Sequence, residues 1–108
     1  MNHVITTINP ATGQPLQTYQ AWNARQIDQA ADSAHAAAAA WGRQPLAERV
    51  AALRRLARQL RAQKDRFARL ITAEMGKPLA EAAGELEKSA VTAEYYADNA
   101  ARLVADEQ

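Results

Sequence analysis

The apolar positions between Pro45 and Pro78 predict a long helical segment over residues 45–75. Apolar side chains recur there at steps of three and four residues, which places them on one stripe of a helix. This stripe comprises Leu46, Val50, Leu53, Leu56, Ala57 and Leu60. Burying one large apolar side chain gains roughly 2 kcal/mol, but ordering each backbone residue costs about 1–2 kcal/mol. The segment therefore needs packing partners.

The same segment should break near its middle. Gln63 and Lys64 occupy the step where the stripe requires an apolar residue, and a second stripe follows at Phe67, Leu70 and Ile71. An unbroken helix over this span would be about 45 Å long, well beyond a usual globular helix. We expect a break near Lys64 and Asp65, with Asp65 as the N-cap of the second piece.

A first helix is predicted at residues 23–42. Asn23 and Gln26 have the spacing of a capping box, and Gly42 follows the last apolar position. The apolar stripe of this helix is Ile27, Ala30, Ala31, Ala34, Ala38 and Trp41. Its many alanines favour helix formation and close contact with a neighbour.

A last helix is predicted at residues 78–105. Gly76 should end the central segment in the left-handed conformation, and Pro45 and Pro78 suit the first position of their helices. Tyr95 and Tyr96 point about 100° apart, so we expect one in the core and the other at an interface or at the surface. The apolar stripe comprises Leu79, Ala83, Leu86, Ala90, Ala93, Ala97, Ala100 and Val104.

The amino-terminal pattern predicts a β-hairpin over residues 4–22. Val4 to Ile8 and Leu16 to Trp22 are rich in β-formers, and the sequence Asn9-Pro10-Ala11-Thr12-Gly13 between them is typical of a turn. The fold class is therefore mainly α within an α+β chain: a hairpin followed by three to four amphipathic helices. We treat residues 1–108 as a single partial domain, since an isolated hairpin is marginal in water.

Composition narrows the possible functions. The 108 residues include no cysteine, which excludes disulfides, thiolate metal sites and cysteine nucleophiles within the chain. Its net charge of +1 and 48% hydrophobic content are typical of a folded globular protein. No secretory signal or membrane-spanning run is recognised, so we expect a cytoplasmic protein with no membrane partner.

Charge is strongly segregated along the chain. Nine basic residues lie between Arg43 and Arg69 against only Glu48 and Asp65, whereas acids dominate after Glu74. The favoured interpretation is two helices lying side by side with complementary faces. A nucleic-acid surface is the alternative, but aromatic residues do not alternate with the arginines as base stacking requires. The basic residues are Arg43, Arg49, Arg54, Arg55, Arg58, Arg61, Lys64, Arg66 and Arg69.

The chain contains only weak candidates for catalytic residues. Asp28, Asp32 and His35 share one helical face and could converge on a divalent ion, but an exposed polar face explains them equally well. A catalytic pair of carboxylates could be drawn from Glu74, Glu81 and Glu85, but glutamates on a helix surface are the far commoner explanation. His3 and His35 have no evident nucleophile to activate, and Ser33 and Ser89 lie in helical patterns. The four glycines form no phosphate-binding motif. We therefore assign no catalytic, cofactor-binding or metal-ligating residue.

Several motifs follow one another along the chain: Ile8-Asn9-Pro10-Ala11-Thr12-Gly13, the helix ending near Trp41, Glu48-Arg49 with the leucine-arginine helix, Glu74-Met75-Gly76-Lys77-Pro78-Leu79 with Glu81-Ala82, and Tyr95-Tyr96-Ala97. In this order they resemble the amino-terminal segment of an NAD(P)-dependent aldehyde dehydrogenase. The run Glu85-Leu86-Glu87-Lys88-Ser89-Ala90 is most similar to the succinate-semialdehyde dehydrogenase branch.

The resemblance implies an architectural role for the chain. Members of the family oxidise aldehydes through a cysteine thiolate, hydride transfer to nicotinamide and a glutamate base. The family motifs that supply this thiolate, the nicotinamide site and the base lie outside these 108 residues, so no catalytic residue carries over. Glu74-Met75-Gly76-Lys77 lacks the second glycine of the family's later E-L-G-G-K stretch. The implied fold is the amino-terminal part of the cofactor-binding domain, without its Rossmann sheet.

The leading hypothesis is a truncated amino-terminal segment that is inactive by itself. Its expected partners are the remainder of the dehydrogenase chain and further copies of itself, bound through the apolar helix face; NAD or NADP would serve the full-length parent only. A stand-alone helical interaction module is the main alternative. Nucleic-acid binding through the basic helix is the less favoured one.

Overall fold

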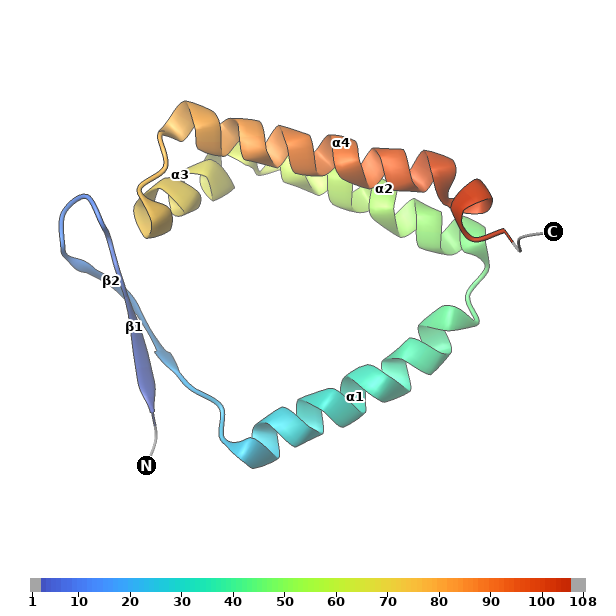
Figure 1. Ribbon diagram of the computed structural model, residues 1–108, viewed down its shortest axis with the longest axis horizontal. Coiled ribbons are helices and arrows are strands. Elements are labelled where there is room, and N and C mark those ends of the chain that lie inside the picture. Colours follow the sequence, from blue (N-terminus) through green and yellow to red (C-terminus); the bar gives the residue numbers. More distant parts are fainter. Residues whose placement is uncertain (1–2, 106–108) are drawn as a thin grey trace. The chain divides into compact units, whose positions relative to one another are not determined.

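The computed structural model describes residues 3–105 and is mainly helical, with one antiparallel hairpin, which confirms the predicted fold class (Figure 1). Asp106 and Glu107, which contribute to the predicted acidic excess, lie outside the described residues. The elements in chain order are β1 (Val4–Ile8), β2 (Pro15–Gln20), α1 (Ala24–Gly42), α2 (Leu46–Ala62), α3 (Lys64–Met75) and α4 (Leu79–Leu103).

The described residues form two compact units. The first contains the hairpin, α1 and the end of α3 at Ala73–Gly76; the second contains α2, most of α3, and α4. Within the described part of the chain, no helix is both long and apolar enough to cross a membrane.

The hairpin of the first unit is held by its turn. Asn9 accepts backbone hydrogen bonds from Gly13 at 2.8 Å and, through its side-chain oxygen, from Ala11 at 2.9 Å. Gly13 has φ +70°, the positive value expected at this position. β2 ends at Gln20 instead of Trp22, because β1 pairs with it only up to Val4. A register shift lies between Thr7 and Ile8.

The hairpin contacts the end of α3 through Thr7 and Gly76. The Thr7 hydroxyl donates to Glu74 Oε1 at 3.2 Å. Gly76 has φ +71°, as expected for a helix terminator, and a Cβ at this position would lie 3.0 Å from Pro10 Cγ. The turn between the strands therefore packs against Gly76. Glycine is required there both by the positive φ and by the close approach of Pro10.

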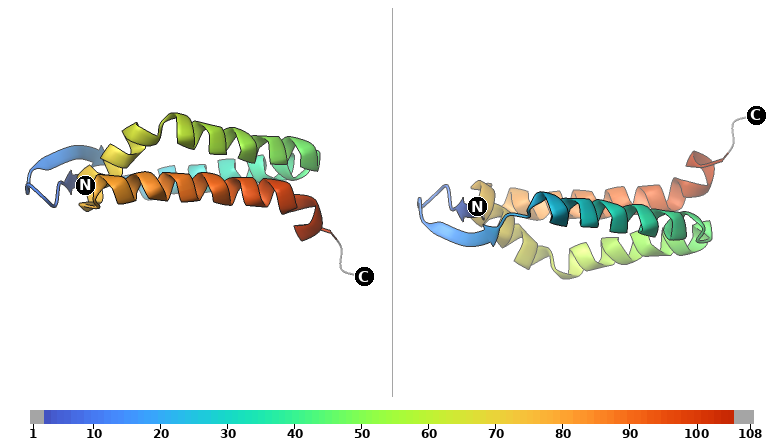
Figure 2. Two further views of the ribbon diagram at one scale, coloured as in Figure 1. Left: turned by 90° about the horizontal axis from the view of Figure 1, so that it is seen from above. Right: turned by 90° about the horizontal axis from the view of Figure 1, so that it is seen from below.

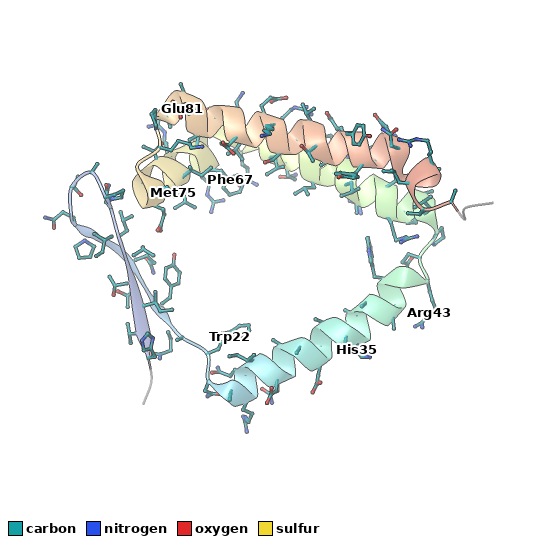
Figure 3. The ribbon with its side chains drawn as sticks, in the orientation of Figure 1. Trp22, His35, Arg43, Phe67, Met75 and Glu81 are labelled. Carbon is teal, nitrogen blue, oxygen red and sulfur yellow. The ribbon has the colours of Figure 1, made fainter. Side chains whose placement is uncertain are left out.

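The start of α1 follows the predicted capping box. Asn23 accepts from the Gln26 backbone and Gln26 accepts from the Asn23 backbone, both at 3.0 Å. The apolar stripe of this helix is not buried: Ile27 is 55% and Trp41 50% exposed. Figure 3 marks Trp22 just before the helix and His35 within it. α1 thus forms from its own local signals and contributes no buried residue.

Helices α2 and α4 lie side by side and antiparallel in the second unit (Figures 1 and 2). Their contact is built mainly from small residues: Ala57 of α2 packs in a cluster with Ala90 and Ala93 of α4. The buried residues of α4 are Ala82, Leu86, Ala90, Ala93 and Ala97. Small side chains allow close helix approach, as the α4 pattern predicted.

The burial of the two stripes differs from expectation in its details. Leu56 is 48% exposed, and Ala82 is buried where the pattern placed Ala83. Leu79 and Val104, at the ends of the predicted α4 stripe, are also exposed. Where alanines close the contact, Leu56 lies at its border, whereas Leu86 is buried and Leu60 packs against the alanine cluster.

Three local predictions at helix starts were wrong. Pro45 and Pro78 are N-caps with ψ 142° and 137°, so each helix begins one residue later. The fixed φ of proline is compatible with both the N-cap and the first helical position. The extended ψ of these two prolines is not helical, so each is the N-cap. The break falls at Gln63, and Asp65 lies inside the first turn of α3 instead of capping it. There its charge still favours the helix amino terminus.

The prediction for the tyrosine pair was also wrong. Tyr95 and Tyr96 are 51% and 53% exposed, so neither is in the core. Their rings meet edge to face, with centroids 5.5 Å apart and planes at 81°. Ala93 and Ala97 occupy the buried face of α4, which leaves both rings outside it.

Candidate functional site

The most organised polar feature of the described residues is the ion-pair cluster around Arg61, between α2 and α4. Its guanidinium donates to both carboxylate oxygens of Glu94, at 2.5 and 2.8 Å, and to Glu87 at 2.9 Å. These hydrogen bonds raise the pKa of Arg61, and the hydrogen bond from Arg61 lowers the pKa of Glu94. The fork geometry of arginine suits such bidentate pairing and orients the two helices.

Two further ion pairs extend the polar border. Arg54 pairs with Asp98 at 2.8 Å across α2 and α4, with both side chains more than half exposed. Lys77 donates to Glu85 at 2.7 Å, which lowers the pKa of Glu85 and raises the pKa of Lys77. The predicted complementary charges on neighbouring helices are therefore confirmed. The sequence did not reveal which residues pair, because that depends on the register between the helices.

A groove of about 400 Å³ lies along one side of the α2–α4 contact. Leu53 and Leu56 contribute from α2, while α4 contributes a mixed border of polar and small side chains. The groove is lined by Leu53, Leu56, Glu85, Lys88, Ser89, Thr92 and Ala93. Its apolar side comes from Leu53 and Leu56, which suits packing against another structural element better than catalysis.

The weak metal candidate does not form a ligand cluster. Asp28, Asp32 and His35 are all exposed on α1. Within residues 3–105, no group of three or more histidine, cysteine, aspartate or glutamate side chains is placed to hold a metal ion. The polar-face interpretation accounts for the spacing of these three residues.

The carboxylate candidates have structural contacts. Glu74 accepts from Thr7, and Glu85 is paired with Lys77. A general acid at neutral pH requires a raised carboxyl pKa, whereas Lys77 lowers that of Glu85. Figure 3 shows Glu81 at the start of α4, where its charge suits the helix amino terminus.

The hydroxyl candidates also lack an activating partner. Ser33 donates to the backbone oxygen of Gln29 at 2.8 Å, a bond within its own helix. Ser89 lines the groove, and the charged residues that line it with Ser89 are Glu85 and Lys88. Among the described residues, neither histidine side chain forms a hydrogen bond to a serine or a carboxylate that would make a catalytic pair. No acyl-transfer site follows from these contacts.

The glycines of the chain are not arranged as a dinucleotide-binding site requires. Gly13 lies in the hairpin turn and Gly76 ends α3, both with positive φ, while Gly42 and Gly84 belong to helices. A dinucleotide fingerprint instead places its glycines between a strand and the helix that directly follows it.

Comparison with known proteins supplies the context that the local geometry lacks. The family model described as "Aldehyde dehydrogenase family" matches residues 1–108. A probable NADP-linked succinate-semialdehyde dehydrogenase of Synechocystis is 39% identical over 103 residues. A succinate-semialdehyde dehydrogenase [NADP(+)] 1 of Mycobacterium bovis is 41% identical over 103 residues. Each alignment covers 95% of this chain but only 23% and 22% of the respective relative.

Solved structures give the same relationship. The succinic semialdehyde dehydrogenase of Streptococcus pyogenes, crystallised with NADP⁺, matches with a TM-score of 0.87 and 34% identity, over 93% of this chain and 22% of that one. The NADP-dependent glyceraldehyde-3-phosphate dehydrogenase of Bacillus halodurans matches with a TM-score of 0.89 and 32% identity, over 94% and 21%. Sequence and fold thus agree over almost all of this chain, which belongs to the aldehyde dehydrogenase family.

Proposed function

We propose that this chain is the amino-terminal structural segment of a succinate-semialdehyde-like dehydrogenase that uses NADP. The observation that carries this proposal is the coverage: relatives with that activity in their names match 95% of this chain, which spans less than a quarter of their length. The parent enzyme would oxidise an aldehyde to a carboxylate. Its cysteine nucleophile must lie outside these residues, because the chain contains none.

The contribution of the chain is to present packed surfaces to the rest of the enzyme. The α2–α4 pair buries mostly alanines and leaves Leu53 and Leu56 along an open groove. The hairpin has two strands only, and such a sheet is marginal without further packing. The remainder of the dehydrogenase is the partner that we assign to these surfaces. We propose residues 1–108 as one partial domain of that enzyme.

The isolated chain should also associate with itself. Many large apolar side chains are exposed, including Ile27, Trp41, Leu56 and Leu70. Exposed apolar side chains that lie together, as Leu53 and Leu56 do along the groove, are typical of contact regions. In the absence of the remaining dehydrogenase, a second copy is the partner available to cover it.

The proposed function is tested by reassembly. The chain is co-expressed with the remainder of the Synechocystis relative, from which the matching segment has been deleted, and NADPH formation is measured with succinate semialdehyde. We expect no turnover from the chain alone, because it lacks the nucleophile, and turnover from the reassembled pair. Heat-sensitive NADPH formation by the purified chain alone would contradict a purely structural role.

Matched variants show whether reassembly depends on the helix pair. Ala90→Glu places a charge in the buried α2–α4 contact and should abolish the restored activity. Ala80→Glu alters an exposed position of the same helix and should retain it. Equal activity of both variants would show that the folded α2–α4 pair is not what the remaining dehydrogenase requires.

A further inference from the structure

We draw no further inference here: the strongest candidate, the groove beside the α2–α4 contact lined by Leu53, Leu56 and Thr92, is an unpartnered surface, and nothing in the structure shows what covers it beyond the packing role already proposed.

Discussion

At the scale of single residues, Gly76 combines two separate requirements. Its φ of +71° lies in the left-handed region, which any residue with a Cβ adopts only at a cost. A Cβ there would also meet Pro10 Cγ at 3.0 Å. Gly13 has nearly the same φ, +70°, with nothing within 4 Å of the corresponding Cβ position. Substitutions at the two glycines therefore allow the effect of backbone strain to be distinguished from the effect of crowding by Pro10.

We expect Gly76→Ala to destabilise the chain more than Gly13→Ala. Left-handed strain alone costs roughly 1–2 kcal/mol, and only the Gly76 variant must also shift the proline ring. Urea unfolding followed by circular dichroism measures both free energies of unfolding. Equal losses would mean that the Pro10 contact contributes nothing to stability.

Arg61 shows at the same scale how one residue links two helices. It makes three hydrogen bonds to two glutamates of α4, whereas Arg54 makes one to Asp98. The Arg61 side chain is 36% exposed, so solvent screens part of the attraction. The pairing should orient the helices more than it stabilises them.

At the scale of elements, the α2–α4 pair depends on the small size of its contact residues. Ala57 and Ala90 are fully buried where the helices meet. Neither position leaves room for a larger side chain without separating the helices or shifting the backbone. The pair is therefore sensitive to added volume at its alanines.

We expect Ala90→Leu to lower stability, because overpacking a closed contact costs roughly 1–3 kcal/mol. Ala80→Leu is the matched control, since Ala80 is exposed on the same helix and has the same helix propensity change. Thermal unfolding followed by circular dichroism compares the two. A melting temperature of Ala90→Leu at or above that of the unmodified chain would contradict the close packing.

The same helix pair should lose stability in acid. Arg61 lowers the pKa of Glu94, and Lys77 lowers that of Glu85. A carboxyl with a lowered folded-state pKa stabilises the fold fully above its unfolded pKa, about 4.3, and this contribution is lost as pH falls through the folded value. Melting temperatures should therefore fall as pH drops below about 4.3.

The variant Arg61→Gln tests the source of this pH dependence. It removes the main cause of the lowered Glu94 pKa while leaving Lys77 and Glu85 in place. Its melting temperature should depend less steeply on acid pH than that of the unmodified chain. An unchanged slope would show that other groups govern acid unfolding.

At the scale of the whole molecule, small side chains fill the buried contact while many large apolar side chains stay exposed. The buried residues are six alanines and Leu86, and none of the larger described side chains is completely enclosed. Large apolar side chains usually supply most of the burial energy of a domain. We therefore expect the chain to need partners that complete its core.

We expect the purified chain to self-associate in a concentration-dependent manner. Light scattering after size-exclusion chromatography, over a series of loading concentrations, measures the mass. Leu56→Glu should weaken association, because Leu56 is 48% exposed at the groove. Arg58→Glu changes an exposed α2 residue that does not line the groove and serves as the control. A stable monomer at every concentration would contradict the prediction.

Features that depend on neighbouring residues could be predicted from the amino-acid sequence. The Asn23–Gln26 capping box, the positive φ of Gly76, and the hairpin turn from Asn9 to Gly13 all formed as predicted, because each rests on hydrogen bonds or steric freedom within a few residues. The order of hairpin and helices followed from the same local signals. The motifs also identified the family correctly.

How the helices meet could not be predicted in the same way, because it depends on contacts between residues far apart along the chain. The buried face of α4 passes through Ala82 instead of Ala83, Leu56 lies at a border, and Arg61 pairs with Glu94 and Glu87. Each result depends on the distance and register between helices that are separated along the chain. Periodicity gives the direction of a side chain on its own helix, but several packings of alanine-rich faces satisfy it, and the contact geometry selects one.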